Sequence, residues 1–305
     1  MEAVHLDGVT KSFGDFLAVQ DLTLSVPEGA VYGFIGPNGS GKTTTIRMIM
    51  NILQPDRGTV RVLGQTAGGS TRRRIGYLPE ERGMYRKMKV QDLLVFLGRL
   101  QGSSRADLLP RIDAWLERLG LQDWRDRKVE ELSKGMGQKV QFIATVLHDP
   151  ELVILDEPFS GLDPVNMEVL SRIVLDWRQR GRTVIFSTHV MEQAEKLCDH
   201  VFMICRGEKV LDGTLDEIRR RFGEDTLWIS GEGDLEVLRE REDVLELHDR
   251  NGSAEVQLRE DADPQEILRA ILPGYRVRRF ERRAPTLHDV FIRLAGAEAF
   301  EERES

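Results

Sequence analysis

The chain has 305 residues, a hydrophobic fraction of 40% and a formal net charge of −8. That length can bury one large core or two modest ones, and the acidic balance excludes a global positive field that would attract nucleic acid or an anionic membrane surface. No apolar run reaches the roughly 18–20 residues of a membrane-spanning helix, and the first residues lack the features of a signal peptide. We therefore expect a cytoplasmic protein, with any membrane spans supplied by another chain.

The first predicted strands cover residues 4–6, 22–26 and 31–35, where apolar residues alternate or run between turn signals. A polar loop between the first two carries Phe13 and Phe16. An exposed aromatic ring in such a loop can stack on a nucleobase if a phosphate-binding loop follows it in the chain. It can equally cap a small sheet. These residues alone leave both uses open.

A glycine-rich loop follows the third strand and precedes an apolar helical segment. Its residues are Gly36, Pro37, Asn38, Gly39, Ser40, Gly41, Lys42, Thr43 and Thr44. The loop fits the pattern G-x-x-x-x-G-K-[ST]. Its backbone N–H groups can surround an anion, and the helix N-terminus behind them adds a favourable dipole. Lys42 would reach the β- and γ-phosphates and Thr43 would ligate Mg²⁺, so the chain is expected to bind a nucleoside triphosphate.

A helical insert is predicted at about residues 85–148, where the apolar residues change to helical spacing. The segment 132–138 forms a Ser/Gly-rich turn before the last of these helices, predicted at about residues 139–148. Such a turn is a second plausible anion site, although similar turns cap ordinary helices.

Polar residues follow two predicted core strands. The apolar run 152–155 is typical of a strand buried on both faces, and it ends at Asp156 and Glu157. Ligand crevices in doubly wound sheets open at the carboxyl ends of strands. Asp156 can hold Mg²⁺ through water, and Glu157 can polarise a water for attack on the γ-phosphate. His189, after the strand at 183–188, can contact that phosphate, although a lone histidine is most often structural.

The region beyond about residue 223 has a different character. The predicted order is strand, helix, strand, strand, helix and strand, with a hairpin turn at residues 249–253 and a last helix at 287–294. This order favours a small α+β domain of the ferredoxin-like type. The acidic end of the chain is predicted to be disordered.

In their order along the chain, these landmarks resemble the ATP-binding subunit of an ABC transporter. Residues 36–43 resemble its Walker A loop, 132–136 its signature sequence, 152–157 its Walker B strand with the catalytic glutamate, and 160–163 its D-loop. The resemblance implies an α/β fold with a P-loop NTPase core, an antiparallel β subdomain and a helical insert.

The resemblance also implies roles for single residues. Phe13 matches the A-loop aromatic that stacks on adenine, and His189 matches the switch histidine. Glu80 stands where the family has the Q-loop glutamine, and it can still offer an oxygen to Mg²⁺. Ser133 and Gly135 match the signature residues that contact the γ-phosphate of ATP bound to an opposing chain.

Two departures from the family pattern stand out. Lys134 and Met136 replace a glycine and the glutamine of Leu-Ser-Gly-Gly-Gln, and the carboxylate of Glu80 replaces a neutral amide. The additional negative charge lies near phosphate oxygens. Our hypothesis is that Glu80 makes nucleotide binding more dependent on Mg²⁺.

The resemblance divides the chain into domains. It implies an ATP-binding domain at residues 1–222, with its helical subdomain at about 85–148, an accessory α+β domain at 223–296 and an acidic tail at 297–305. Residues 285–291 are similar to the closing motif of a subgroup that includes sodium- and drug-export-like systems.

The resemblance finally implies a function. Expected cofactors are ATP and Mg²⁺, and expected partners are an integral membrane permease and a second ATPase subunit, either identical or related, placed head to tail. Mg²⁺-dependent hydrolysis would then drive export from the inner face of the cell membrane. The helical insert and the loop 81–85 would receive a cytoplasmic helix of the permease. The alternative is a soluble ABC-class ATPase acting on ribosomes or DNA, but such proteins often carry two cassettes, long coiled-coil inserts or basic extensions, so no nucleic acid partner is expected here.

Overall fold

The computed structural model describes residues 1–68, 71–80, 83–222, 226–250, 253–259, 261–283 and 285–296. These residues form two compact units, Met1–Gly213 and Thr214–Gly296. Helix α7 (Leu215–Phe222) therefore groups with the second unit, so that the division lies before the boundary at residue 222 that the sequence suggests. The expected acidic tail, 297–305, lies outside the described residues.

The first unit is built on a largely parallel sheet with strand order β10-β9-β3-β8-β7-β6. Strands β9, β3, β8, β7 and β6 run parallel to one another. Their bounds are β3 Val31–Ile35, β6 Ile75–Leu78, β7 Leu152–Leu155, β8 Thr183–Thr188, β9 His200–Cys205 and β10 Glu208–Thr214.

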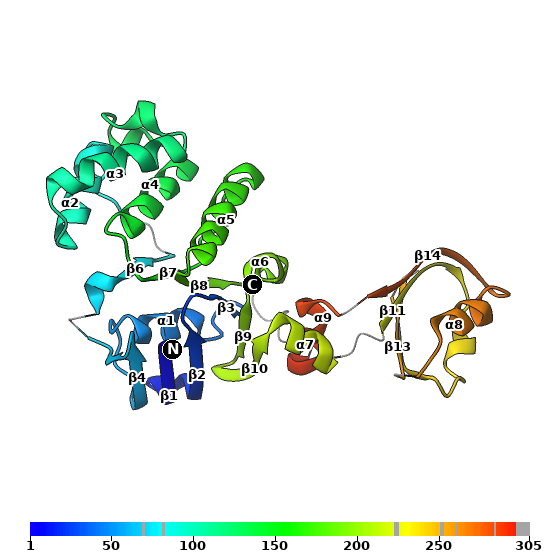
Figure 1. Ribbon diagram of the computed structural model, residues 1–305. Coiled ribbons are helices and arrows are strands. Elements are labelled where there is room, and N and C mark those ends of the chain that lie inside the picture. The colour runs from blue at the N-terminus through cyan, green and yellow to red at the C-terminus, as the bar shows by residue number, and fades with distance from the viewer. Residues whose placement is uncertain are drawn as a thin grey trace. The chain divides into compact units, whose positions relative to one another are not determined.

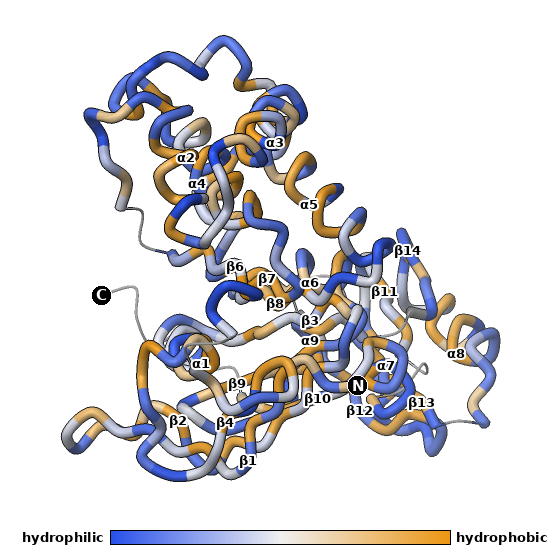
Figure 2. Tube along the Cα trace, turned by 60° about the vertical axis from the view of Figure 1, so that its left-hand side comes forward, coloured by the Kyte–Doolittle hydropathy of each residue, from blue (hydrophilic) through white to orange (hydrophobic). Residues whose placement is uncertain are grey.

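Burial explains why these strands are apolar runs. Every residue of β3, β7 and β8 is buried, and the trace of β7 and β8 is coloured as hydrophobic in Figure 2. A parallel sheet covered on both faces requires such continuous runs. Because the strands are parallel, the residues that follow β3, β6, β7 and β8 all emerge at the same edge of the sheet.

An antiparallel sheet packs beside the central one, in the order β2-β1-β4-β5. Its strands are β1 Glu2–Phe13, β2 Phe16–Pro27, β4 Arg57–Val62 and β5 Gln65–Thr66. Residues of both sheets share one hydrophobic core. The first hairpin is longer than its sequence pattern predicts, since β1 and β2 remain paired as far as Phe13 and Phe16, which lie opposite each other. The expected aromatic loop is therefore the tip of a hairpin.

Helices pack around the central sheet and form the insert. Figure 1 shows α2, α3 and α4 gathered beyond β6, and their bounds agree with a helical insert. The bounds are α1 Lys42–Ile49, α2 Val90–Leu100, α3 Arg105–Arg118, α4 Lys134–Val146, α5 Pro164–Gln179 and α6 Met191–Leu197, with short 3₁₀ helices η1 Arg72–Arg74, η2 Gln122–Trp124 and η3 Val129–Glu131. The rings of Trp115, Phe142 and Trp177 join α3, α4 and α5, with centroids 5.4–6.2 Å apart.

Helix α4 begins earlier than its sequence predicts, at Lys134 instead of about residue 139. The hydroxyl of Ser133 accepts a hydrogen bond from the backbone N–H of Met136 at 3.3 Å, and so caps the helix. Glycines have low helix propensity, but this cap and the packing of the later turns hold Gly135 and Gly137 in the helix.

The second unit contains a sheet with the order β12-β13-β11-β14, in which neighbouring strands are antiparallel. Its elements are β11 Thr226–Gly233, η4 Glu236–Leu238, β12 Val244–Arg250, β13 Ser253–Leu258, α8 Pro264–Ile271, β14 Tyr275–Arg283 and α9 Leu287–Ala295. This is the expected ferredoxin-like order, with the first helix shortened to the 3₁₀ turn η4. Helix α8 and η4 pack on one face of the sheet and form its hydrophobic core. The expected hairpin turn includes Asn251 and Gly252, which lie outside the described residues.

Within the described part of the chain, no helix combines the length and the apolar character required to cross a membrane.

The close approach of α4 to β6 generates a prediction. A Cβ atom on Gly76 would lie 2.4 Å from the backbone oxygen of Thr145, so Gly76→Ala must displace the helix from the sheet edge. We expect the substitution to lower the free energy of unfolding by about 1–3 kcal/mol in denaturant titrations. Gly68→Ala is the control, because a Cβ atom on Gly68 would lie 3.7 Å from its nearest neighbour, the backbone oxygen of Thr66. This substitution should change the free energy of unfolding by less than about 0.5 kcal/mol. Equal effects of the two substitutions would contradict the packing argument.

Candidate functional site

A cavity of about 330 Å³ opens at the carboxyl edge of the central sheet. It is lined from three directions, by the tip of the first hairpin, by the glycine-rich loop with the start of α1, and by residues that follow β6 and β7. The lining residues are Phe13, Phe16, Ala18, Asn38, Gly39, Gly41, Lys42, Thr43, Thr44, Glu80 and Glu157. We refer to this space as the edge cavity. It brings together most of the residues that the sequence predicts for nucleotide binding.

The glycine-rich loop approaches its neighbours too closely for larger residues. Gly41 has φ +112°, and a Cβ atom there would lie 2.6 Å from the backbone oxygen of Ala18. Lys42 follows at the start of α1, and its ammonium donates to the backbone oxygens of Gly36 at 2.7 Å and Pro37 at 3.0 Å. Burial lowers the pKa of Lys42. The loop thus holds a buried cation and a helix N-terminus at one place, which is the arrangement that binds phosphate groups.

The two acidic residues after β7 are held by a serine on β8. The Ser187 hydroxyl donates to Asp156 Oδ1 at 2.6 Å and accepts from the backbone N–H of Glu157 at 2.8 Å. Ser187 is fully buried. Ser187 is not among the residues predicted from the sequence, although a hydroxyl at the end of the otherwise apolar run Val184–Phe186 is a signal that could identify it.

Glu157 occupies a strained and buried position. Its φ is +47°, a left-handed conformation that is uncommon for residues with a side chain. Its Oε2 lies 3.1 Å from His189 Nδ1, and its Oε1 lies 3.8 Å from Lys42 Nζ. Burial raises the pKa of Glu157, while the neighbouring imidazole and ammonium act in the opposite direction. A carboxylate with a raised pKa is a stronger base and is better suited to accept a proton from water.

The oxygen atoms required by Mg²⁺ also meet here. Thr43 Oγ1 donates to Asp156 Oδ1 at 3.3 Å, and Glu80 lines the same cavity. Asp156 is 1% exposed, and its Oδ2 is a buried atom with no hydrogen-bond partner among the described residues. Buried carboxylate oxygens are normally satisfied, and Mg²⁺ binds oxygen ligands through one or two carboxylates and its own waters. The donor set of Thr43, Asp156 and Glu80 therefore fits this ion.

Ser133 and Gly135 do not join this site within one chain. Neither residue lines the edge cavity, and Ser133 is exposed at the start of α4. A different residue of that helix connects it to the site: the side-chain nitrogen of Gln138 donates to the backbone oxygens of Pro158 and Ser160, both at 3.1 Å. Gln138 was not predicted as a functional residue. It ties the first turns of α4 to the segment directly after Glu157.

This chain is similar in sequence to known families and proteins. The profile of a family described as "ABC transporter" matches residues 19–160, and that of the "ATP-binding protein DrrA1-3-like, C-terminal domain" matches residues 213–295. The chain is 44% identical over 292 residues to the uncharacterized ABC transporter ATP-binding protein YhaQ of Bacillus subtilis (strain 168), covering 96% of this chain and 98% of that protein. It is 34% identical to the Nod factor export ATP-binding protein I of Rhizobium sp. (strain N33), covering 97% and 98%.

Solved structures agree with these matches. One described as the ATP binding subunit of an ABC transporter superimposes with a TM-score of 0.68 at 32% sequence identity, covering 72% of this chain and 93% of that one.

The burial of Glu157 generates a pH-dependent prediction. Folding raises the pKa of this carboxyl, so its ionised form lowers the free energy of unfolding at neutral pH. This destabilisation disappears at a pH where the group is protonated in both the folded and the unfolded chain. For the nucleotide-free protein, we expect Glu157→Gln to raise Tm by a few degrees at pH 7.5. The gain should vanish below about pH 4. Thermal melts across this range test the prediction, and an unchanged or lower Tm of the variant at pH 7.5 would contradict it.

Proposed function

The chain belongs to the ATP-binding proteins of ABC transporters and is an ATPase. On this premise we propose that its ATP hydrolysis drives export through a separate integral membrane permease. The observation that carries the ATPase part of the proposal is that Lys42 and the buried Glu157 line one cavity. Asp156, whose Oδ2 has no hydrogen-bond partner among the described residues, is hydrogen-bonded to Thr43 on the same cavity. The direction of transport rests on the export function that the names of the Nod factor export relatives state.

The proposed chemistry assigns a role to each side of the cavity. The phosphates bind Lys42 and the backbone N–H groups of residues 38–44, and the adenine stacks on Phe13, with Phe16 beside it on the hairpin tip. Thr43, Asp156 and Glu80 would hold Mg²⁺, which supplies positive charge to the phosphate oxygens when it is bound.

Glu157 then acts as the general base. It takes a proton from the attacking water, while His189 holds the carboxylate in place through its hydrogen bond and contacts the γ-phosphate. The strained backbone of Glu157, fixed by Ser187, directs the carboxylate toward the cavity.

A second copy of the chain completes each site in this proposal. One chain carries both the edge cavity and the start of α4, where Ser133 is exposed and Gly135 is half-buried. Two copies placed head to tail would bring the start of α4 of each copy onto the ATP of the other. With two identical chains, both resulting sites would contain a base and a histidine. Closing the pair excludes water, and hydrolysis reopens it.

The helical subdomain is the proposed contact with the permease at the inner face of the membrane. Tyr85 and Phe96 are 60% and 38% exposed, and their rings pack edge to face with centroids 5.6 Å apart. An exposed aromatic pair on this subdomain suits a helix from another chain. Glu81 and Arg82 of the predicted docking loop lie outside the described residues. No observation favours the alternative, a soluble ATPase acting on ribosomes or DNA.

Purification from native membranes tests this function. The tagged full chain is extracted in a mild detergent, and the accompanying proteins are identified. A polytopic membrane protein at equal stoichiometry is the expected result. Ribosomal or DNA-repair proteins in its place, with no membrane protein, would contradict the transport function and leave the ATPase activity unaffected.

The role of Glu157 gives a prediction for turnover. Glu157→Gln keeps the size of the side chain but removes the proton acceptor, so we expect ATP binding within about threefold of the unchanged chain and hydrolysis slower by about 10²–10³-fold. Equilibrium binding and steady-state phosphate release measure the two quantities. Glu192→Gln, an exposed substitution on α6, is the matched control. Turnover within tenfold of the unchanged chain would exclude Glu157 as the base.

The carboxylate of Glu80 gives a second prediction. It lies with Thr43 on the edge cavity, where its charge repels phosphate oxygens unless a cation intervenes. We expect removal of Mg²⁺ to weaken ATP binding several-fold more in the unchanged chain than in Glu80→Gln. Titrations of ATP at a series of Mg²⁺ concentrations measure this difference, again with Glu192→Gln as control. Identical Mg²⁺ dependence in the two chains would refute the hypothesis.

A further inference from the structure

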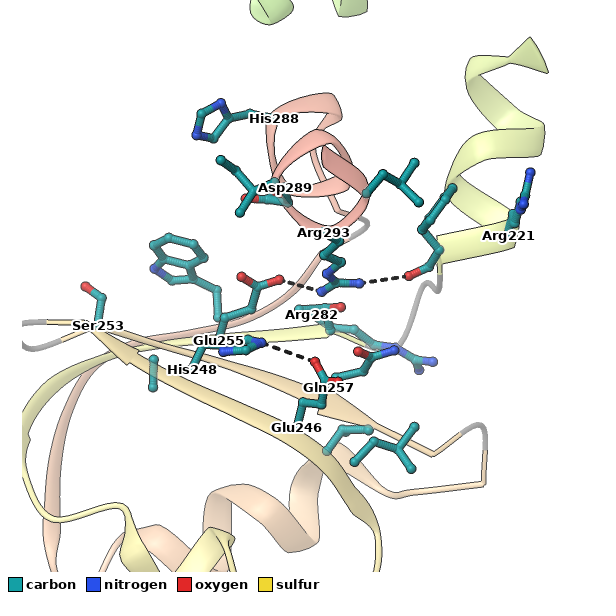
Figure 3. A pocket seen from close by; sticks show the side chains of 18 of the residues that line it. Arg221, Glu246, His248, Ser253, Glu255, Gln257, Arg282, His288, Asp289 and Arg293 are labelled. Atoms are coloured by element: carbon teal, nitrogen blue, oxygen red, sulfur yellow. Dashed lines mark hydrogen bonds and ion pairs between the residues drawn. The ribbon is translucent and has the colours of Figure 1, made fainter. Parts of the chain in front are cut away.

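A second cavity, of about 1180 Å³, lies within the C-terminal unit. Figure 3 shows it between one face of the sheet and helix α9, with Arg221 on α7 at one side. All of its lining residues belong to the second compact unit. The ATPase chemistry described above uses none of them.

The floor of this cavity is the face of the sheet opposite α8. Along β13, Ala254, Val256 and Leu258 belong to the hydrophobic core, so Ser253, Glu255 and Gln257 point to the other face. His248 on β12 and Trp228 on β11 lie beside Glu255 in the strand register. The row His248–Glu255–Trp228 thus crosses three strands and gives the floor one large aromatic surface among polar groups.

The acidic groups of the cavity already have partners. Glu255 Oε1 accepts from Arg293 Nη2 at 2.8 Å, and Glu246 Oε2 lies 3.1 Å from His248 Nε2, as the dashed lines in Figure 3 mark. Asp289 accepts from the N–H of Thr286 at 2.8 Å and thereby caps its own helix. These carboxylates are therefore engaged within the unit.

Arg220 and Arg221 at the end of α7 differ from these carboxylates in their contacts. Arg220 donates to the backbone oxygen of Asp216 at 3.3 Å, and the Arg221 guanidinium lies 5.5 Å from the ring centroid of Phe222. Among the described residues, no carboxylate forms an ion pair with either arginine. Within the part of the chain that the structure describes, this side of the cavity therefore carries positive charge without a paired carboxylate, which attracts an anion.

Thr226 supplies an independent indication of a ligand. It lines the cavity on β11, two residues before Trp228, and is 1% exposed. Its hydroxyl oxygen is buried and has no hydrogen-bond partner among the described residues. Buried hydroxyls are rarely left unsatisfied, because the lost interaction with water is not replaced. A bound molecule that offers a polar atom here would remove that cost.

We propose that this cavity binds a small aromatic anion, with its ring against Trp228, a polar atom at Thr226 and its anionic group at Arg220 and Arg221. The volume of about 1180 Å³ exceeds that of a typical drug-sized site, so the cavity has room for such a molecule. This inference goes beyond the proposed function and does not depend on it, since binding at this cavity is measurable without turnover.

The test uses the full chain with saturating Mg-ADP, which occupies the edge cavity, and 8-anilinonaphthalene-1-sulfonate as the probe. Of the four tryptophans, Trp228 alone lies in this unit, and the others are Trp115, Trp124 and Trp177. We expect saturable binding of one probe per chain with quenching of tryptophan fluorescence, and Trp228→Phe should abolish most of that quenching.

Charge and hydroxyl variants complete the test. We expect the double variant Arg220→Gln/Arg221→Gln to weaken probe binding at least tenfold and Thr226→Val to weaken it several-fold. The matched control Arg239→Gln/Arg269→Gln alters exposed arginines of the same unit that do not line the cavity, and should leave the affinity unchanged. The uncharged N-phenyl-1-naphthylamine should be insensitive to both double variants. Unchanged affinity of the Arg220/Arg221 variant, or quenching that survives Trp228→Phe, would overturn the proposal.

Discussion

One buried hydroxyl determines the geometry on which the ATPase site depends. The Ser187 hydroxyl on β8 donates to Asp156 and accepts from the backbone N–H of Glu157, and these two hydrogen bonds hold the end of β7 against β8. The same hydrogen bonds hold Glu157 in its left-handed conformation, with its carboxylate between His189 and Lys42. This arrangement requires β3, β8 and β7 to lie side by side and parallel, because only then do their carboxyl ends meet.

The start of α4 with Ser133 and Gly135, called here the signature turn, lies apart from the catalytic site, and this separation affects how the site can respond to a partner chain. Ser133 caps α4 on the surface, whereas Gln138, one turn further along the same helix, bonds to the segment after Glu157. A second chain that presses ATP onto Ser133 would therefore move the helix that is tied to the catalytic segment. The hydrogen bonds of Gln138 thus connect the proposed partner contact at Ser133 with the catalytic segment of the same chain.

Sequence alone predicts those parts of the structure that depend on local patterns. The phosphate loop, the acids after β7 and His189 after β8 are each marked by their position at the end of an apolar strand, and parallel pairing brings them together. The links of Ser187 and Gln138 depend on tertiary contacts between distant segments, which no local pattern encodes. The start of α4 was missed for a related reason, since its cap and packing override the low helix propensity of Gly135.

The measurement that tests the account most directly is the mass of the purified Glu157→Gln chain in solution with saturating nucleotide, by sedimentation velocity. The account predicts a dimer with Mg-ATP and a monomer with Mg-ADP, because only the γ-phosphate bridges the edge cavity and the partner's signature turn. Ser133→Arg added to the same chain should leave it monomeric with Mg-ATP while nucleotide remains bound. A monomer with bound Mg-ATP and an unaltered Ser133 would contradict the account.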